Sequence, residues 1–225
     1  DHDYSAACHF EDLKTPQEVG KSAGERAVKR LNARKIASQA VTVIYDRRVA
    51  SSLLGHLSSA INGAAIARGT SFLKSKMGQQ IFSKGISVID DPLRLRGLAS
   101  RPFDGEGLSS SRRELIADGI LTGWVLDLRS ARQLGLPPTG NGSRGLSSPP
   151  GPSTSNLHLK PGQLSPEEMI GSLKQGLYIT ELIGNSVNLV TGDYSRGASG
   201  FWIENGELAF PVSEITIAGN LGDMF

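Results

Sequence analysis

Two residue pairs with strong turn preferences constrain the fold of this chain more than any other feature. Asp118-Gly119 and Asn205-Gly206 each interrupt an apolar run, within the shared pattern I-x-[D/N]-G-x-L. Asp-Gly and Asn-Gly favour two-residue hairpin turns because their residues tolerate positive φ. Glycine supplies 27 of the 225 residues, which indicates many turns and argues against a long helical bundle. We therefore predict two β-hairpins, with strands at 113–117 and 121–125 and at 201–203 and 208–210.

The remaining elements are predicted from apolar periodicity and capping signals. Thr15-Pro16-Gln17-Glu18 has the form of a capping box with proline at the first helical position, so a helix is expected from there to about Lys35. A second helix is expected at 48–67 and a short one after Ser165. Strands are expected at 40–45, 86–89, 178–183 and 187–190, and 137–156 is the least structured stretch. Helices come early and strands late, which predicts an α+β fold: N-terminal helices packed on a largely antiparallel β-sheet, or on a barrel-like C-terminal part, rich in hairpins.

Charge and cysteine content exclude some function classes. The chain has 24 Lys and Arg against 22 Asp and Glu, a net charge of +2, and a pI of about 8.8. Without a basic block, direct DNA binding through phosphate contacts is not expected. The single cysteine, Cys8, cannot form an internal disulfide, which fits a cytoplasmic location. No apolar run approaches the length that spans a bilayer, so no membrane partner is expected.

Several motifs with catalytic associations are present only in part. Gly140–Gly145 matches G-x-G-x-x-G but follows a Pro-Pro pair and precedes a Ser/Pro tract, so it is interpreted as a loop. No G-x-S-x-G or Walker A pattern occurs. The polar end that holds His2, Cys8 and His9 is interpreted as a frayed terminus rather than a metal site. The carboxylate pairs Asp90-Asp91 and Asp104/Glu106 lie beside Pro and Gly, so turn roles are expected for them.

Longer motifs carry a family resemblance. They are G-D-Y-S-R-G-A-S-G-F-W-I-E-N-G at 192–206, F-D-G-E-G at 103–107 and V-S-E-I-T-I-A-G-N-L at 212–221. Together they resemble the TldD/PmbA family, also called modulators of DNA gyrase. The segments at 53–57, 71–73 and 97–100 are similar to its PmbA (TldE) branch. The resemblance covers nearly the whole chain but only the second half of a family member. It implies one C-terminal-type domain over 1–225, without the family's N-terminal domain and its extreme C-terminal tail.

The TldD branch of this family carries H-E-x-x-x-H on a helix, where two histidines bind zinc and the glutamate acts as general base. The resemblance places Gly55 at the first histidine, His56 at the glutamate and Ala60 at the second histidine. Glycine and alanine have no side-chain ligand atom. The resemblance therefore implies no catalytic residue and no metal or other cofactor in this chain, with zinc in a TldD-like partner.

By the same resemblance, the chain belongs to the non-catalytic subunit of a TldD/TldE-type heterodimeric zinc metalloprotease that acts on unfolded peptides. The implied processes are proteolysis, maturation of peptide-antibiotic precursors and antitoxin degradation. Two alternatives stay open, an autonomous peptidase that forms a homodimer and a regulatory protein that binds gyrase or DNA. Glycine-rich segments are the candidates for a peptide path or a partner interface, including β-addition of a peptide at a strand edge near Tyr194. Their residues are Thr139, Gly140, Asn141, Asp193, Tyr194, Ser195, Arg196 and Gly197.

Overall fold

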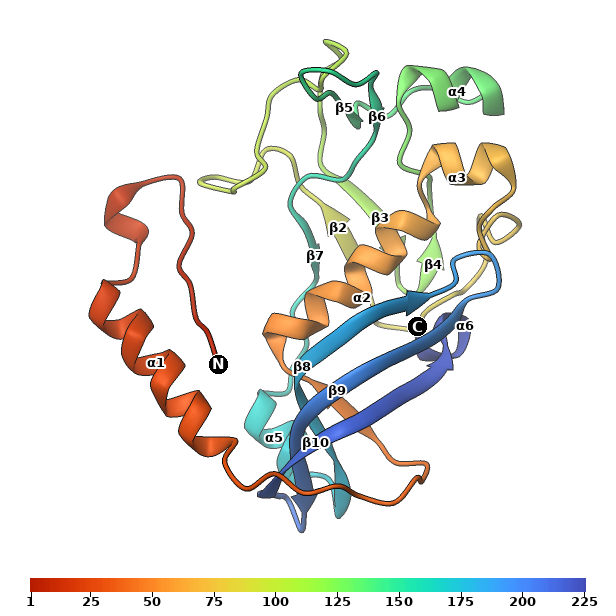
Figure 1. Ribbon diagram of the computed structural model, residues 1–225. Coiled ribbons are helices and arrows are strands. Elements are labelled where there is room, and N and C mark those ends of the chain that lie inside the picture. The colour runs from red at the N-terminus through yellow and green to blue at the C-terminus, as the bar shows by residue number, and fades with distance from the viewer. The chain divides into compact units, whose positions relative to one another are not determined.

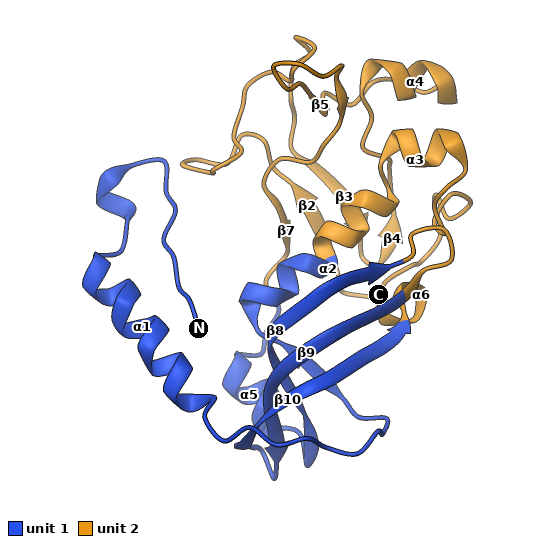
Figure 2. Ribbon diagram, viewed as in Figure 1, with its two compact units in different colours: residues 1–53, 162–187, 194–219 blue, residues 54–161, 188–193, 220–225 orange.

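The computed structural model describes residues 1–225 and is shown in Figure 1. The chain forms two compact units that alternate along the sequence (Figure 2). Unit 1 consists of Asp1–Leu53, Gly162–Val187 and Tyr194–Gly219, and unit 2 of Leu54–Pro161, Asn188–Asp193 and Asn220–Phe225. None of the helices is both long and apolar enough to cross a membrane.

Unit 1 is built on a four-stranded sheet with the order β1-β8-β9-β10. β8 and β9 are antiparallel, whereas β1 pairs with β8 in parallel. The core consists of Leu177, Ile179, Ala198, Trp202 and Val212. The elements of this unit are η1 (Phe10–Asp12), α1 (Pro16–Lys29), β1 (Val43–Tyr45), the start of α2 (Arg47–Ala60), α5 (Pro166–Gly171), β8 (Gln175–Val187), β9 (Asp193–Glu204) and β10 (Glu207–Asn220).

Unit 2 contains an antiparallel sheet with the order β4-β3-β2-β7. Leu57, Ala60 and Ile61 from the end of α2 and the residue after it pack in its core with Val88, Leu115, Ile116, Leu121, Trp124 and Val125. The further elements are α3 (Gly63–Arg68), β2 (Val88–Asp90), β3 (Arg113–Ala117), β4 (Ile120–Leu121), α4 (Leu128–Leu134), β5 (Gly142–Ser143), β6 (Gly151–Pro152), β7 (Leu157–Leu159) and α6 (Leu221–Met224).

The α+β class, the largely antiparallel sheets and both hairpin turns are confirmed, although the strand expected at 121–125 is only the two-residue β4 at Ile120–Leu121. Asp118 and Gly119 have φ of 48° and 83°, and Asn205 and Gly206 have φ of 52° and 82°. These positive values are what a type I′ turn requires. The first pair connects β3 to β4 and the second connects β9 to β10. Local turn chemistry therefore fixes both connections.

The helix starts at Thr15 and Ser165 are also confirmed. Each side chain accepts a hydrogen bond from the backbone three residues later, and Glu18 or Glu168 completes the capping box. The first helix, however, ends at Lys29, six residues before the predicted end, and none of its residues is buried. Its amphipathic pattern therefore marks a surface helix and not a core element.

Two element predictions are wrong. The helix expected at 48–67 is two helices, because Asn62 accepts a hydrogen bond from Ala64 N–H and begins α3. Gly63 packs so closely on α4 of the same unit that a Cβ there would lie 2.6 Å from Ser130 Oγ. The strand expected at 187–190 is also wrong, since β8 ends at Val187 and the chain turns back to β9 through Gly192. Gly192, the last residue before β9, has a φ of 85°, a left-handed value that suits this turn.

Candidate functional site

The helix positions aligned with the zinc motif do not fit a metal. Ala60 is completely buried in the core of unit 2, and its carbonyl accepts a hydrogen bond from Ser71 Oγ at 2.6 Å. Gly55 is exposed on the same helix and has open space where a Cβ would lie. Neither residue has a ligand atom, and no group of three or more His, Cys, Asp or Glu in residues 1–225 could hold a metal ion. His56, between them in sequence, is partly buried.

The predicted loop residues Thr139 and Asn141 belong to a polar network in unit 2. Asn141 is 4% exposed and donates through Nδ2 to Asp90 Oδ2 at 2.9 Å and to the Ser153 carbonyl at 3.3 Å. Thr139 Oγ1 lies 2.8 Å from Asn141 Oδ1 and accepts from Leu126 N–H at 2.9 Å. The loop is therefore fixed to β2 and to the segment before α4, although its sequence is rich in Gly, Ser and Pro.

Carboxylates hold this loop in place. Asp104 is 3% exposed and accepts from the N–H groups of Gly142, Glu106 and Leu108 at 2.8, 2.9 and 2.9 Å. Glu106 accepts from Leu128 N–H at 2.8 Å, at the start of α4. The turn role expected for Asp104 is confirmed, and both of its oxygens are occupied by backbone donors. The Glu106 side chain instead ties the loop to the start of α4, and the turn role expected for Asp90 is wrong, because Asp90 is a buried residue of β2.

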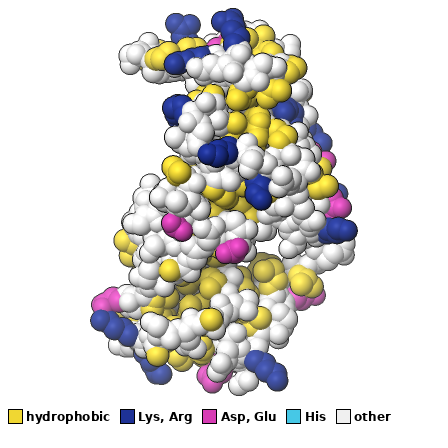
Figure 3. Space-filling view, turned by 90° about the vertical axis from the view of Figure 1, so that its right-hand side faces the viewer, with side chains coloured by type: hydrophobic (Ala, Val, Ile, Leu, Met, Phe, Trp, Pro, Cys, Tyr) yellow, Lys and Arg dark blue, Asp and Glu magenta, His cyan; other side chains and the backbone are white.

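A groove of about 670 Å³ in unit 2 adjoins this network. Of the predicted loop residues, Thr139 and Gly140 line the groove, whereas Asn141 does not line it and is buried. Arg113 and Trp124 also line it, and the sequence reasoning did not single them out. The other lining residues are Met77, Leu108, Ser109, Ser111, Thr122, Gly123, Leu126, Leu136, Pro137 and Pro138. Figure 3 shows exposed apolar side chains gathered on one face of the molecule, with Lys and Arg side chains among them.

The second predicted set, Asp193 to Gly197, has a different setting. Asp193 Oδ2 accepts from Thr191 Oγ1 at 2.6 Å and holds the turn before β9. Tyr194 is 1% exposed, and its side chain is buried beside that of Tyr45. Burial, together with the neighbouring Tyr194 hydroxyl, raises the pKa of Tyr45 above its ordinary value. Ser195 and Gly197 pair with Ser186 and Ile183 of β8, and Arg196 is partly buried.

The expectation of β-addition near Tyr194 is wrong. β9 lies between β8 and β10, so its backbone groups are already used within the sheet. The outer strands of this sheet are β1 and β10, and only an outer strand offers backbone groups to an added peptide. Tyr194 to Gly197 belong to unit 1, whereas Thr139 to Asn141 belong to unit 2.

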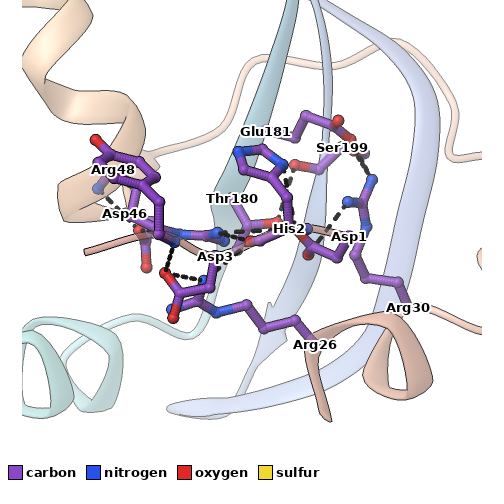
Figure 4. A network of polar contacts seen from close by, with 11 residues as sticks. Asp1, His2, Asp3, Arg26, Arg30, Asp46, Arg48, Thr180, Glu181 and Ser199 are labelled. Atoms are coloured by element: carbon purple, nitrogen blue, oxygen red, sulfur yellow. Dashed lines mark hydrogen bonds and ion pairs between the residues drawn. The ribbon is translucent and has the colours of Figure 1, made fainter. Parts of the chain in front are cut away.

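Unit 1 also contains a polar network, drawn in Figure 4. Arg30 donates to Glu181 and, at 2.6 Å, to Ser199, and Ser199 donates to Glu181 at 2.8 Å. Asp46 accepts from Arg48 N–H at 2.9 Å, at the start of α2, and from the Tyr178 hydroxyl at 2.5 Å. Burial disfavours ionisation of Asp46 and Glu181, but the hydrogen bonds and arginine charges outweigh it and lower both pKa values.

These lowered pKa values predict a loss of stability in acid. A carboxyl group whose pKa is lower in the folded state than in the unfolded state binds fewer protons when the protein is folded. Its contribution to stability is therefore fully present above the unfolded-state pKa and is lost as the pH falls through the folded-state pKa. We expect the free energy of unfolding to decrease as the pH is lowered below the ordinary pKa values of these groups, which are 4.5 for Glu and 3.8 for Asp. Urea denaturation at a series of pH values measures it. Asp46→Asn and Tyr178→Phe should both flatten the profile, and an unchanged slope in both variants would contradict the assignment to Asp46.

Comparisons with known proteins agree on one family. The sequence pattern of the PmbA/TldA metallopeptidase C-terminal domain matches residues 38–225. Metalloprotease PmbA of Escherichia coli O157:H7 is 44% identical over 225 residues, which is 100% of this chain and 48% of that protein. A crystal structure from Thermotoga maritima, named as a candidate modulator of a DNA gyrase, superposes with a TM-score of 0.89 at 35% identity, over 96% of this chain and 50% of that one.

TldE from Thermococcus kodakarensis superposes with a TM-score of 0.83 at 27% identity, over 92% of this chain and 48% of that one. This chain thus spans about half the length of the relatives it matches. The matched region contains the loop network, the groove and the helix with Gly55, His56 and Ala60. The chain belongs to the PmbA/TldD metallopeptidase family, and its residues 38–225 match the C-terminal domain of that family.

Proposed function

We propose that this chain is part of a non-catalytic, PmbA/TldE-like subunit of a two-chain zinc metallopeptidase that cleaves unfolded peptides in the cytoplasm. The observation that carries the proposal is the pair Gly55 and Ala60, which leaves the positions of both motif histidines without a ligand atom. Ala60 is also enclosed by core side chains, so the helix face at that position packs in the hydrophobic core. The partner in this proposal is a TldD-like chain that carries H-E-x-x-x-H and supplies the zinc.

The processes assigned to the complex are general proteolysis, maturation of peptide-antibiotic precursors and degradation of an antitoxin. In each case the substrate is an unfolded or extended peptide. The role proposed for this chain is to complete the chamber in which the two-chain enzyme encloses its peptide, and to bind that peptide. The metal that activates water belongs to the partner. The loop at 139–141 supports this role because a buried network holds its backbone beside a groove.

The test uses the full-length protein that contains this chain, purified alone and co-expressed with a TldD-like chain. We expect no stoichiometric zinc on the protein alone, stable co-purification with the partner, and chelator-sensitive cleavage of an unfolded peptide only by the pair. Zinc content is measured by mass spectrometry and cleavage by chromatography. Stoichiometric zinc on the isolated protein, or cleavage by it that chelators do not inhibit, would identify an autonomous peptidase instead. Salt-sensitive DNA binding without peptide cleavage would favour the regulatory alternative.

A further inference from the structure

The lining of the groove in unit 2 is largely apolar and carries one positive charge. Its walls include Trp124, Leu126, Leu136 and the Pro137-Pro138 pair, and its volume of about 670 Å³ is in the range that encloses small ligands. Leu136 is exposed, and so is Met77 on the lining. The only charged side chain that lines the groove is that of Arg113, at the start of β3. A ligand that fills the groove therefore meets mainly apolar surface, a few Ser and Thr side chains and a single charged group, the Arg113 guanidinium.

The environment of Arg113 leaves its charge without a close carboxylate. Nη1 donates to the Trp124 carbonyl at 3.2 Å and lies 3.5 Å from Asn141 Oδ1. Burial lowers the pKa of Arg113, while the charge of Asp90 partly opposes that effect. Asp90 itself is engaged elsewhere, since its two oxygens accept from Asn141 Nδ2, Ser155 N–H and Ser155 Oγ. The guanidinium is thus partly desolvated, although it stays charged at neutral pH.

The backbone makes room for the rest of the guanidinium. A Cβ at position 123 would lie 2.6 Å from Arg113 Nη2, so glycine at this position leaves the guanidinium the space that it occupies. The hydrogen bonds made by Arg113 come from Nη1, which leaves Nε–H and the Nη2 donors on the other edge of the fork. That edge has the geometry that binds a carboxylate with two parallel hydrogen bonds.

We propose that this groove binds the C-terminal end of an apolar peptide, with the terminal carboxylate on Arg113 and the last side chains against Trp124 and the 136–138 wall. A peptide end fits because it has one negative charge next to apolar side chains. A second charge would find no partner in the lining. The exposed Ser109 and Ser111 hydroxyls lie on the lining, where peptide amide groups need polar partners. The inference rests on the proposed function only in taking the ligand to be a peptide.

Fluorescence anisotropy of a labelled short peptide that ends in two leucines tests this with the full-length protein alone. We expect the free acid to bind roughly tenfold or more tightly than the C-terminal amide, as loss of a charge-assisted hydrogen bond implies. Arg113→Gln should remove this difference and Arg113→Lys should retain part of it. Arg112→Gln is the matched control, because Arg112 is 56% exposed, does not line the groove, and should bind as wild type.

Arg113→Gln loses the hydrogen bond to the Trp124 carbonyl and could fold incorrectly for that reason. A second variant therefore tests the proposal without changing Arg113. Leu136→Glu places a negative charge on the exposed rim of the groove and should weaken the free acid roughly tenfold by repulsion while the amide changes less. Equal affinity of acid and amide would overturn the proposal. So would an amidated peptide with an internal glutamate that binds as well as the free acid, since it would assign the site to acidic side chains. This binding assay contains no zinc subunit. A negative result here therefore leaves the proposed two-chain enzyme to be judged by its own test.

Discussion

Replacing Gly200 with alanine is expected to lower the free energy of unfolding by about 3 kcal/mol. Gly200 is a buried residue of β9, in the glycine-rich segment that the family resemblance singles out. A Cβ there would overlap the Tyr178 carbonyl oxygen and would lie 2.9 Å from Ile179 Cα. These are backbone atoms of β8, next to the register shift between Ile179 and Glu181. They cannot move away without disturbing the pairing of the two strands.

Gly197→Ala is the matched control for this prediction. Gly197 is in the same strand, but a Cβ at that position would lie 3.4 Å from Ile183 Cβ, an ordinary contact. We expect a change of about 0.5 kcal/mol or less. Urea denaturation followed by tryptophan fluorescence measures both variants. If Gly200→Ala is as stable as Gly197→Ala, close backbone packing is not the reason for glycine at position 200.

The elements that the sequence predicts correctly depend on local chemistry. Asn205-Gly206 determines its turn through the φ preferences of two adjacent residues, and Thr15 caps a helix through a backbone N–H three residues away. The break in the expected helix at 48–67 involves a distant residue as well as a local cap, and one pairing that no sequence pattern predicts joins distant segments. The helix breaks at Asn62 where that residue forms a bridge with Val125, and β1 pairs in parallel with β8, more than a hundred residues later. No local pattern contains that information.

The candidate site shows the same division. Glycine and proline content identifies the loop that contains Thr139 and Gly140, which does line a groove. Arg113 carries no comparable signal, because Arg112 next to it has the same charge and an exposed side chain. What separates the two arginines is Gly123, Asn141 and Asp90, which the fold brings to Arg113 from other segments. Tyr194 is a different case, since its motif suggests function whereas its side chain is buried beside Tyr45.

Removing the Asp90 carboxylate is expected to lower the free energy of unfolding by about 3 kcal/mol, because Asp90→Ala leaves buried donors without an acceptor. Asp90 is 2% exposed and accepts from Asn141 Nδ2 at 2.9 Å and from Ser155 N–H and Oγ at 2.7 and 2.6 Å. Asp90→Asn should lose less, since its amide keeps one acceptor oxygen.

The adjacent Asp91 provides the control for Asp90. Its Oδ1 accepts from Leu93 N–H at 3.0 Å, and its other oxygen lies 4.0 Å from Nε of the exposed Arg112. We expect Asp91→Ala to cost about 1 kcal/mol or less. Thermal and urea denaturation compare the three variants. Equal losses at positions 90 and 91 would mean that the network around Asn141 does not hold the loop, and the 139–141 wall of the groove would then lack the rigidity that a peptide site on Arg113 requires.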